Sequence, residues 1–398
     1  MIQGIIFRFK VSSILFILLV FLFVSCGSEI NATNNKTDFQ GKNFIKEAQF
    51  LYDVFACGKN SLQSGKSKKA VENHCGKISK GEKEYSNRFF RHFKPFMAKV
   101  TPAQIPATVI YPFGGSDAHT AFGTFPKAKE LITISLETSG DPRKAYKEKG
   151  WRLRRNIRHF NRALVTYLVT FENSNSNVMG LEKGSVPGQL SLSLAAAVYY
   201  KYKPLSLRYF RFKKNGQIYY YTEKDIRRYK GRRTPKISKF IFRAPWEVPF
   251  INMEVTYKRP DGSIFIHKHI SANLYNTVFN RSGLKKYLNS IGPVVAMTKG
   301  ASYLPWFNGF SGINDYLLRN MTFMICDSTG ILPWKAEKAG FKVTTYGKWI
   351  DGFKPIYQSR DSIRLRKFFR SQPFREIKFQ FGHSDRRKRK HLMILEKR

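Results

Sequence analysis

Acidic residues are scarce in this chain. Its 398 residues include 27 Asp and Glu against 70 Lys and Arg, which gives a formal net charge of +43. A charge of this size attracts anionic partners. It does not imply disorder, because 42% of the residues are hydrophobic and the 35 Phe and 20 Tyr can build a core. The composition therefore predicts a folded protein with a basic exterior.

No apolar run is long enough for a spanning helix, which takes about 20 residues. The run from Val11 to Val24 follows Arg8 and Lys10, as in a secretory signal peptide. Small residues before Cys26 resemble the bacterial lipobox. That resemblance implies cleavage after residue 25 and a lipid on Cys26, so that the protein is anchored to a membrane without crossing it. An ordinary signal peptide with a coincidental cysteine is the alternative.

Cysteine is also scarce, with four in the chain. If Cys26 carries lipid, Cys57, Cys75 and Cys326 remain. Export permits disulfides, and a bridge from Cys57 to Cys75 would close a loop of 17 intervening residues. Zinc binding with His74 is the competing interpretation, but no CxxC or HxxxH partner accompanies it. We expect the disulfide and no metal site.

The patterns divide the chain into four segments: a signal peptide at 1–25, a polar tether at 26–41, a helical N-terminal extension at 42–100 and an α/β domain at 101–398. In the extension, helices are expected at 43–56 and 82–94, with Pro95 ending the second one. Asn215-Gly216 and Pro260-Asp261-Gly262 predict two hairpins, inserted at about 204–270. His267 and His269 share a face of one hairpin strand, as ordinary strand histidines without a third metal ligand.

Strand-like runs alternate with helical patterns in the α/β domain. This alternation favours a mixed, mainly parallel, Rossmann-like sheet with the hairpins inserted in it. The strand-like runs are 108–113, 131–136, 293–298, 323–326, 341–346, 376–381 and 391–395.

The clearest helical pattern spans residues 149–171. Apolar residues repeat along it at spacings of three and four, from Leu153 to Phe171. The opposite face carries Arg154, Arg155, Arg158 and Arg162. We expect the apolar stripe to pack on the protein's own sheet and the arginines to face water, where they can contact phosphate or carboxylate. A helix lying on a membrane is the alternative.

Five short blocks occur in order: YPFGGSD (111–117), FP (125–126), ISLE (134–137), KGASY (299–303) and DSTGI (327–331). In these blocks the chain resembles a family of uncharacterised bacterial secreted or lipid-anchored proteins with YPF-G-D, ASY and D-S-G-I-P segments. Thr329 and Leu332 interrupt the last block, which reads DSTGILP here. The resemblance covers residues 100–398 and implies the domain and its export, without implying a reaction.

Polar residues follow four of the expected strands. Carboxyl ends of parallel strands share one rim, where open α/β sheets bind ligands, so we expect these residues to converge. The candidate catalytic residues are Asp117, His119, Glu137, Lys299 and Asp327. The candidate ligand-binding residues are Gly114, Gly115, Ser116, Ser328 and Gly330.

Three interpretations of this rim remain open. In a hydrolase, Asp117 or Glu137 would be the general base, His119 the acid and Lys299 the oxyanion partner, although no GxSxG, HExxH or Ser-x-x-Lys motif is present. Gly114-Gly115 with Glu137 also fits a nucleotide site weakly, and we expect no cofactor. In a purely structural role, the glycines make a turn, Asp117 caps a helix and Asp327 caps a turn.

The sequence is therefore consistent with two functions. The first is a lipid-anchored protein of the bacterial cell envelope whose basic surface engages anionic envelope polymers or lipid head groups. The second is an extracytoplasmic hydrolase or transferase with its site at the strand-end rim. Export argues against nucleic acid as a partner, and the lack of Asp after Cys26 favours the outer membrane.

Overall fold

The computed structural model describes residues 41–58, 67–170, 178, 181, 185–229, 248–349, 359–382 and 390–398. Gln40–Arg398 form one compact unit, so the expected helical extension and α/β domain belong together. The expected signal peptide, Cys26 and the tether up to residue 40 lie outside the described residues. None of the described helices combines the length and apolar character needed to cross a bilayer.

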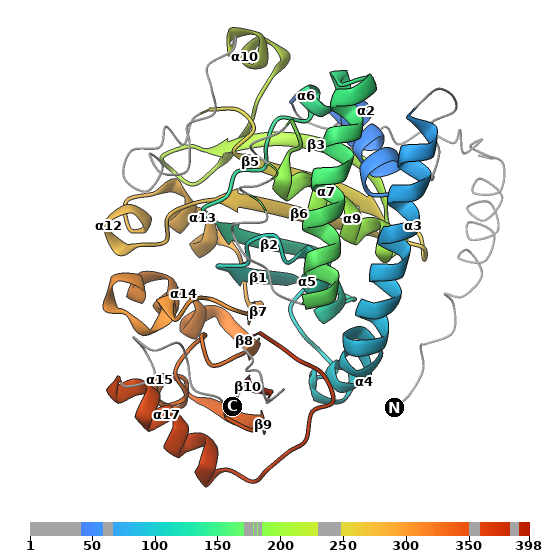
Figure 1. Ribbon diagram of the computed structural model, residues 1–398. Coiled ribbons are helices and arrows are strands. Elements are labelled where there is room, and N and C mark those ends of the chain that lie inside the picture. Colours follow the sequence, from blue (N-terminus) through green and yellow to red (C-terminus); the bar gives the residue numbers. More distant parts are fainter. Residues whose placement is uncertain are drawn as a thin grey trace, which may run out of the picture. The chain divides into compact units, whose positions relative to one another are not determined.

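A ten-stranded mixed sheet forms the centre of the described chain (Figure 1), in the order β4-β3-β5-β6-β2-β1-β7-β8-β10-β9. Most of the expected strands are present, including both hairpins. The strands are β1 (Thr108–Pro112), β2 (Glu130–Ser135), β3 (Lys203–Phe212), β4 (Ile218–Tyr220), β5 (Asn252–Lys258), β6 (Ile264–Ser271), β7 (Val294–Thr298), β8 (Met321–Cys326), β9 (Phe341–Gly347) and β10 (His391–Lys397).

The prediction of a mainly parallel sheet was wrong. Strands β6, β2, β1, β7 and β8 run parallel. The remaining five of the nine pairings are antiparallel. The hairpin strands β3 to β6 account for three of the antiparallel pairings. They belong to the main sheet because β6 pairs with β2. The C-terminal strand β10 accounts for the rest, since it lies between β8 and β9 and runs against both.

Helices cover both faces of the sheet. Alternate residues of a strand face opposite sides, so Val109 and Tyr111 join one core cluster and Ile110 joins the other. The first cluster includes residues of α2 (Ile45–Phe50), α3 (Lys68–Tyr85), α4 (Arg91–Val100), α5 (Ala118–Thr124), α6 (Pro142–Lys147), α7 (Gly150–Thr170), α9 (Gly188–Tyr199) and α10 (Glu223–Arg228). The second includes residues of α12 (Asn276–Phe279), α13 (Gly283–Ser290), α14 (Ser311–Asn320), α15 (Pro333–Lys338) and α17 (Arg360–Ser371). The described unit is a three-layer α/β/α arrangement (Figure 1).

Pro95 does not end its helix, contrary to the sequence-based expectation. It lies inside α4, which continues α3 through the π-helical turn Ser86–Phe90. A π-helical turn already departs from the regular hydrogen-bond ladder, and the chain remains helical through the proline that follows it.

The expected strand at 376–381 is absent. This segment has no regular structure, yet Phe379 and Phe381 are buried. Their rings contact Phe93 of α4, at centroid distances of 5.3 and 5.8 Å. An alternating apolar pattern therefore arises here from packing against a helix, without a partner strand.

Candidate functional site

The strand order reverses at β1, which lies between β2 and β7. Open α/β sheets bind ligands outside the carboxyl ends of the strands at such a point. Left-handed backbone occurs in the loop that follows β1 and in the loop that follows β7. Phe113, Ser302 and Tyr303 have φ of 60, 51 and 61°, and Gly115 and Gly300 are left-handed as well. Each non-glycine case costs on the order of 1–3 kcal/mol, so the surrounding contacts must hold these loops in place.

Asp117 directly precedes α5, but its side chain makes no capping hydrogen bond. The residue is 1% exposed. Its carboxylate accepts hydrogen bonds from Tyr111 Oη at 3.0 Å and Tyr167 Oη at 2.5 Å, and lies 3.0 Å from Lys299 Nζ. The helix-capping alternative was therefore wrong, and Asp117 belongs to a buried ion pair.

Lys299 completes this cluster from the end of β7. It is 9% exposed, and its ammonium group also donates to Thr120 Oγ1 at 3.0 Å. Burial, reinforced by the charge of Asp117, raises the pKa of Tyr111 and Tyr167 well above the usual value. Both phenols therefore stay protonated and donate to the carboxylate. The expected convergence of Asp117 and Lys299 is observed, in a form that satisfies both charges internally.

His119 lies beside this ion pair. It is fully buried among the rings of Tyr85, Tyr167 and Tyr199, with centroids 5.5 to 5.9 Å away. Neither ring nitrogen has a hydrogen-bond partner among the described residues. Burial lowers the pKa of His119 to about 3, with Lys299 adding to the effect and Asp117 opposing it. The imidazole is therefore neutral at physiological pH, and the imidazolium form that a histidine general acid ordinarily uses is not populated.

Asp327 fastens the loop after β8 to the loop after β7. Its carboxylate accepts from the Thr329 amide at 3.0 Å, which is the expected turn cap, and from the Gly300 amide at 3.0 Å. The backbone of Gly382 lies directly over it, because a Cβ there would stand 1.9 Å from Asp327 Oδ2. Asp327 therefore holds the two loops together, and the Gly300 amide that it binds directly follows Lys299 in the chain.

The remaining candidate residues are buried, except for Gly115, which is half-buried. No contact between the Glu137 side chain and the ion pair is recorded among the described residues. A Cβ on Gly330 would stand 2.5 Å from Thr298 Oγ1, and one on Gly114 would stand 2.8 Å from the Tyr111 ring. Ser116 and Ser328 are buried. Two cavities of the described chain are lined by other segments, one on α10 and one beside β3 and β6.

A second buried polar network links β2, β5, β6 and α9. It runs through Tyr257, Ser193, His267, Thr133, His269 and the carbonyl oxygen of Glu137, with distances of 2.7 to 3.0 Å. Since a carbonyl only accepts, His269 Nε2 carries the hydrogen and Nδ1 accepts from Thr133. Thr133 then accepts from His267 Nε2. Burial lowers the pKa of His267 to about 3 and of His269 to about 4, so both rings are neutral.

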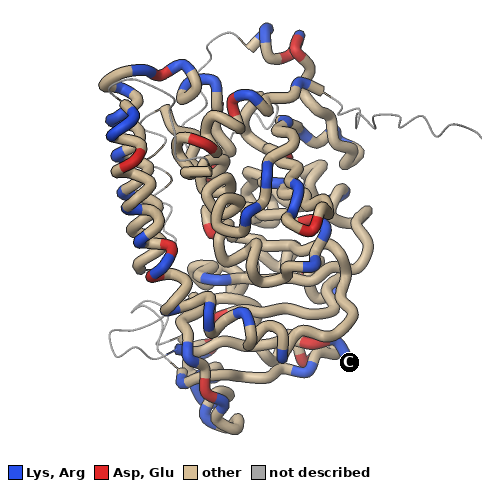
Figure 2. The backbone as a smooth tube through the Cα atoms, turned by 90° about the vertical axis from the view of Figure 1, so that its right-hand side faces the viewer, with Lys and Arg blue, Asp and Glu red and all other residues tan. Residues whose placement is uncertain are grey.

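The arginine row lies on α7 as expected. The apolar stripe of α7 joins the core, and Arg155, Arg158 and Arg162 are exposed while Arg154 is half-buried. None of the four forms an ion pair with a described residue. Figure 2 shows the wider setting, in which Lys and Arg are spread along the described chain and Asp and Glu are fewer. These guanidinium groups remain available to an external anion.

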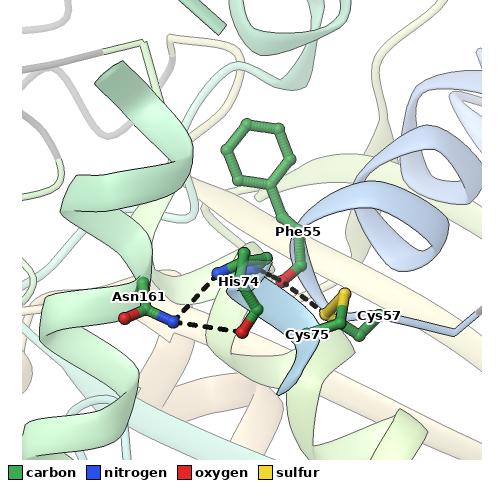
Figure 3. The surroundings of a disulfide bond; sticks show 5 residues. All are labelled: Phe55, Cys57, His74, Cys75 and Asn161. Carbon is green, nitrogen blue, oxygen red and sulfur yellow. Dashed lines mark hydrogen bonds between the residues drawn. A yellow bond between two sulfur atoms is a disulfide. The ribbon is translucent and has the colours of Figure 1, made fainter. Parts of the chain in front are cut away.

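Cys57 and Cys75, the expected pair, are joined by a disulfide (Figure 3). His74 lies beside it and completes a group of three ligand-type side chains. Both of its ring nitrogens are engaged, Nε2 with the Phe55 carbonyl at 2.7 Å and Nδ1 with the Asn161 amide at 3.0 Å. With the sulfurs bonded to each other and the imidazole held on both sides, this group acts as a staple.

Sequence reasoning missed Tyr111, Tyr167 and Thr120, which supply hydroxyl groups to the ion-pair cluster. Tyr167 precedes Leu168 on the buried side of α7, so a hydroxyl inside that apolar stripe was the available signal. Comparison with protein-family models, curated protein sequences and solved structures found no match for this chain.

Proposed function

We propose that this protein is a lipid-anchored component of the bacterial cell envelope that binds anionic lipid head groups through one basic face. This surface, called the α6–α7 face, consists of exposed residues of α6, α7 and the turn between them. They are Lys144, Tyr146, Lys147, Lys149, Trp151, Arg152, Arg155, Arg158 and Arg162. From Lys144 to Thr170 the chain has eight Lys and Arg and a single acid, Glu148.

Trp151 is the observation that carries this proposal. Its side chain is 58% exposed, although tryptophan is large and usually well covered in soluble proteins. The guanidinium carbons of Arg152 and Arg155 lie 5.7 and 5.0 Å from its ring centroid. Tryptophan surrounded by cations is typical of protein surfaces at the head-group level of a membrane.

The energetics favour orientation of the protein on a membrane. A cation close to an anionic membrane contributes about 1 kcal/mol, so the exposed cations of the face together rival a lipid chain. A lipid on Cys26 would hold the protein at the membrane, and the α6–α7 face would then set which side faces the bilayer.

The order of the parallel strands, reversing beside β1, supports a Rossmann-like architecture for that part of the sheet.

Vesicle co-sedimentation of the Cys26→Ala chain without its leader tests the face separately from the anchor. We expect binding to phosphatidylglycerol vesicles, little binding to phosphatidylcholine vesicles, and loss of binding between about 50 and about 500 mM NaCl. The triple variant Lys147→Gln, Arg152→Gln, Arg155→Gln and the single variant Trp151→Ala should both bind at least about tenfold more weakly.

The matched control removes the same charge from the opposite helical layer. Lys286→Gln, Lys338→Gln and Arg360→Gln lie on α13, α15 and α17 and are exposed. Equal loss of binding in this control would reject a defined face. Radiolabelled palmitate tests the anchor, and undiminished labelling of Cys26→Ala would reject it.

An enzymatic site at the strand-end rim has less support. Asp117 and Lys299 neutralise each other, His119 is not an imidazolium at neutral pH, and the cluster is buried. A hydrolase needs these groups beside a cavity that admits substrate. We therefore assign the cluster to the stability of the switch-point loops.

A further inference from the structure

A cavity of about 370 Å³ lies beside the ends of β3 and β6. Both strands run antiparallel to β5, so Phe212 and Ser271 end their strands on the same side. This is the carboxyl edge of the parallel strands, separated from the β1–β7 switch point by β2. A volume of several hundred Å³ is typical of small-molecule sites.

The lining of this cavity, called the β3–β6 pocket, has two chemical parts. Phe212, Ile270, Val278 and Leu284 supply apolar surface. Lys213, Lys214 and Arg281 supply three cations, and none of the lining residues is Asp or Glu. None of the three cations forms an ion pair with a described residue.

Polar groups and tight packing fix the walls of the pocket. Asn252 is 4% exposed, and its side chain donates to the Phe210 carbonyl and accepts from the Ser271 amide, which holds it in place. A Cβ on Gly283 would stand 2.3 Å from the Lys213 carbonyl oxygen, so the first turn of α13 lies directly against the β3–β4 turn. The pocket is therefore preformed, which lowers the entropic cost of binding.

We infer that the β3–β6 pocket binds a small organic phosphate, with its apolar part on the hydrophobic lining and its phosphate against the three cations. A planar guanidinium pairs with phosphate oxygens through two parallel hydrogen bonds, and lysines add point charges. Three cations without an acid favour a dianionic group over a single carboxylate. This inference is independent of the α6–α7 face, which lies in the other helical layer.

Calorimetric titration with phenyl phosphate, near physiological ionic strength, tests the inference on the leaderless Cys26→Ala chain. We expect saturable binding at one site, with a Kd of about 1 mM or tighter. Inorganic phosphate lacks the apolar part and benzyl alcohol lacks the charge, so each should bind at least about tenfold more weakly.

Variants locate the binding. Arg281→Gln and Lys214→Gln should each weaken phenyl phosphate binding about tenfold, and Val278→Trp should block it by filling the cavity. Lys285→Gln is the control, because Lys285 lies on α13, whose first turn borders the pocket, but its ammonium group bonds Asn280 outside the lining. Its affinity should stay within about twofold.

Three results would overturn the inference. The first is the absence of saturation up to about 10 mM phenyl phosphate. The second is an unchanged affinity in Arg281→Gln and Lys214→Gln. The third is an equal loss of affinity in Lys285→Gln, which would indicate general attraction by the basic surface. Thermal unfolding of each variant confirms that the fold is retained. If Val278→Trp fails to fold, Arg281→Gln and Lys214→Gln measured against Lys285→Gln still decide the inference.

Discussion

Lys299 and Asp117 are both buried, and each is the other's counter-ion. Replacing Lys299 with Met keeps its length but leaves a buried carboxylate without a cation. Breaking a buried pair in this way costs about 3–5 kcal/mol. We expect Lys299→Met to lower the free energy of unfolding by that amount in urea denaturation. The double variant with Asp117→Asn should be more stable than Lys299→Met alone, because no buried charge remains.

An exposed ion pair provides the comparison. Lys42 lies 2.7 Å from Glu223, with both side chains well exposed, so Lys42→Met should change the free energy of unfolding by less than about 1 kcal/mol. A Lys299→Met variant no less stable than Lys42→Met would mean that the buried cluster contributes nothing to the fold, and the enzymatic interpretation would need to be revisited.

For these two residues, the sequence predicted where the side chains lie better than it predicted which groups they bond. Polar residues after parallel strands have to meet at one rim, and Asp117 and Lys299 do. The hydrogen bonds of Asp117 could not be predicted, because one of its partners, Tyr167, comes from a helix 50 residues further along the chain. Glu137 follows a strand at the same rim, yet it is His269 that contacts it, through a hydrogen bond to the Glu137 backbone carbonyl.

Among the elements, the disulfide ties the end of the first helical segment to α3. The loop between Cys57 and Cys75 has 17 intervening residues, for which the chain-entropy relation gives about 3 kcal/mol. Cys57→Ser with Cys75→Ser should lower the free energy of unfolding by about that amount. Dithiothreitol should destabilise the wild type equally and leave the double variant unchanged. If dithiothreitol did not change the stability of the wild type, the bridge would be absent or would not restrict the unfolded chain.

Helix α7 and the 376–381 segment show what local patterns can predict. The repeat of three and four residues predicts the start of α7 to within one residue, because an apolar stripe of that spacing and length fits only a helix. The last residue of the predicted stripe, Phe171, lies outside the described residues. Two-residue alternation is weaker evidence. It is satisfied at 376–381 by packing on α4, and it carries no information on strand direction, which is why the antiparallel pairing of β10 with β8 and β9 was missed.

Across the whole molecule, buried histidines link stability to pH. Burial lowers the pKa of His74, His119, His267 and His269 from the ordinary value of 6.5. Below pH 6.5 the unfolded chain therefore binds more protons than the native protein. The free energy of unfolding decreases as the pH is lowered, until the histidines of the native protein titrate as well. Each fully shifted histidine costs about 2 kcal/mol at pH 5. Glu82 has the opposite effect, because burial raises its pKa to about 7 and lowering the pH therefore favours the native protein at this one group.

His119 allows this dependence to be tested at one position. Phenylalanine fits its aromatic surroundings and removes two ring nitrogens that have no hydrogen-bond partner among the described residues. Because the native pKa is about 3, His119→Phe should equal or exceed the wild-type stability at pH 7 and gain about 2 kcal/mol relative to it at pH 5. The measurement is urea denaturation across this range. Tyr199→Phe alters the same aromatic cluster without an acid-range group and should leave the pH slope unchanged, whereas an unchanged slope in His119→Phe would mean that the imidazole is protonated in the native core.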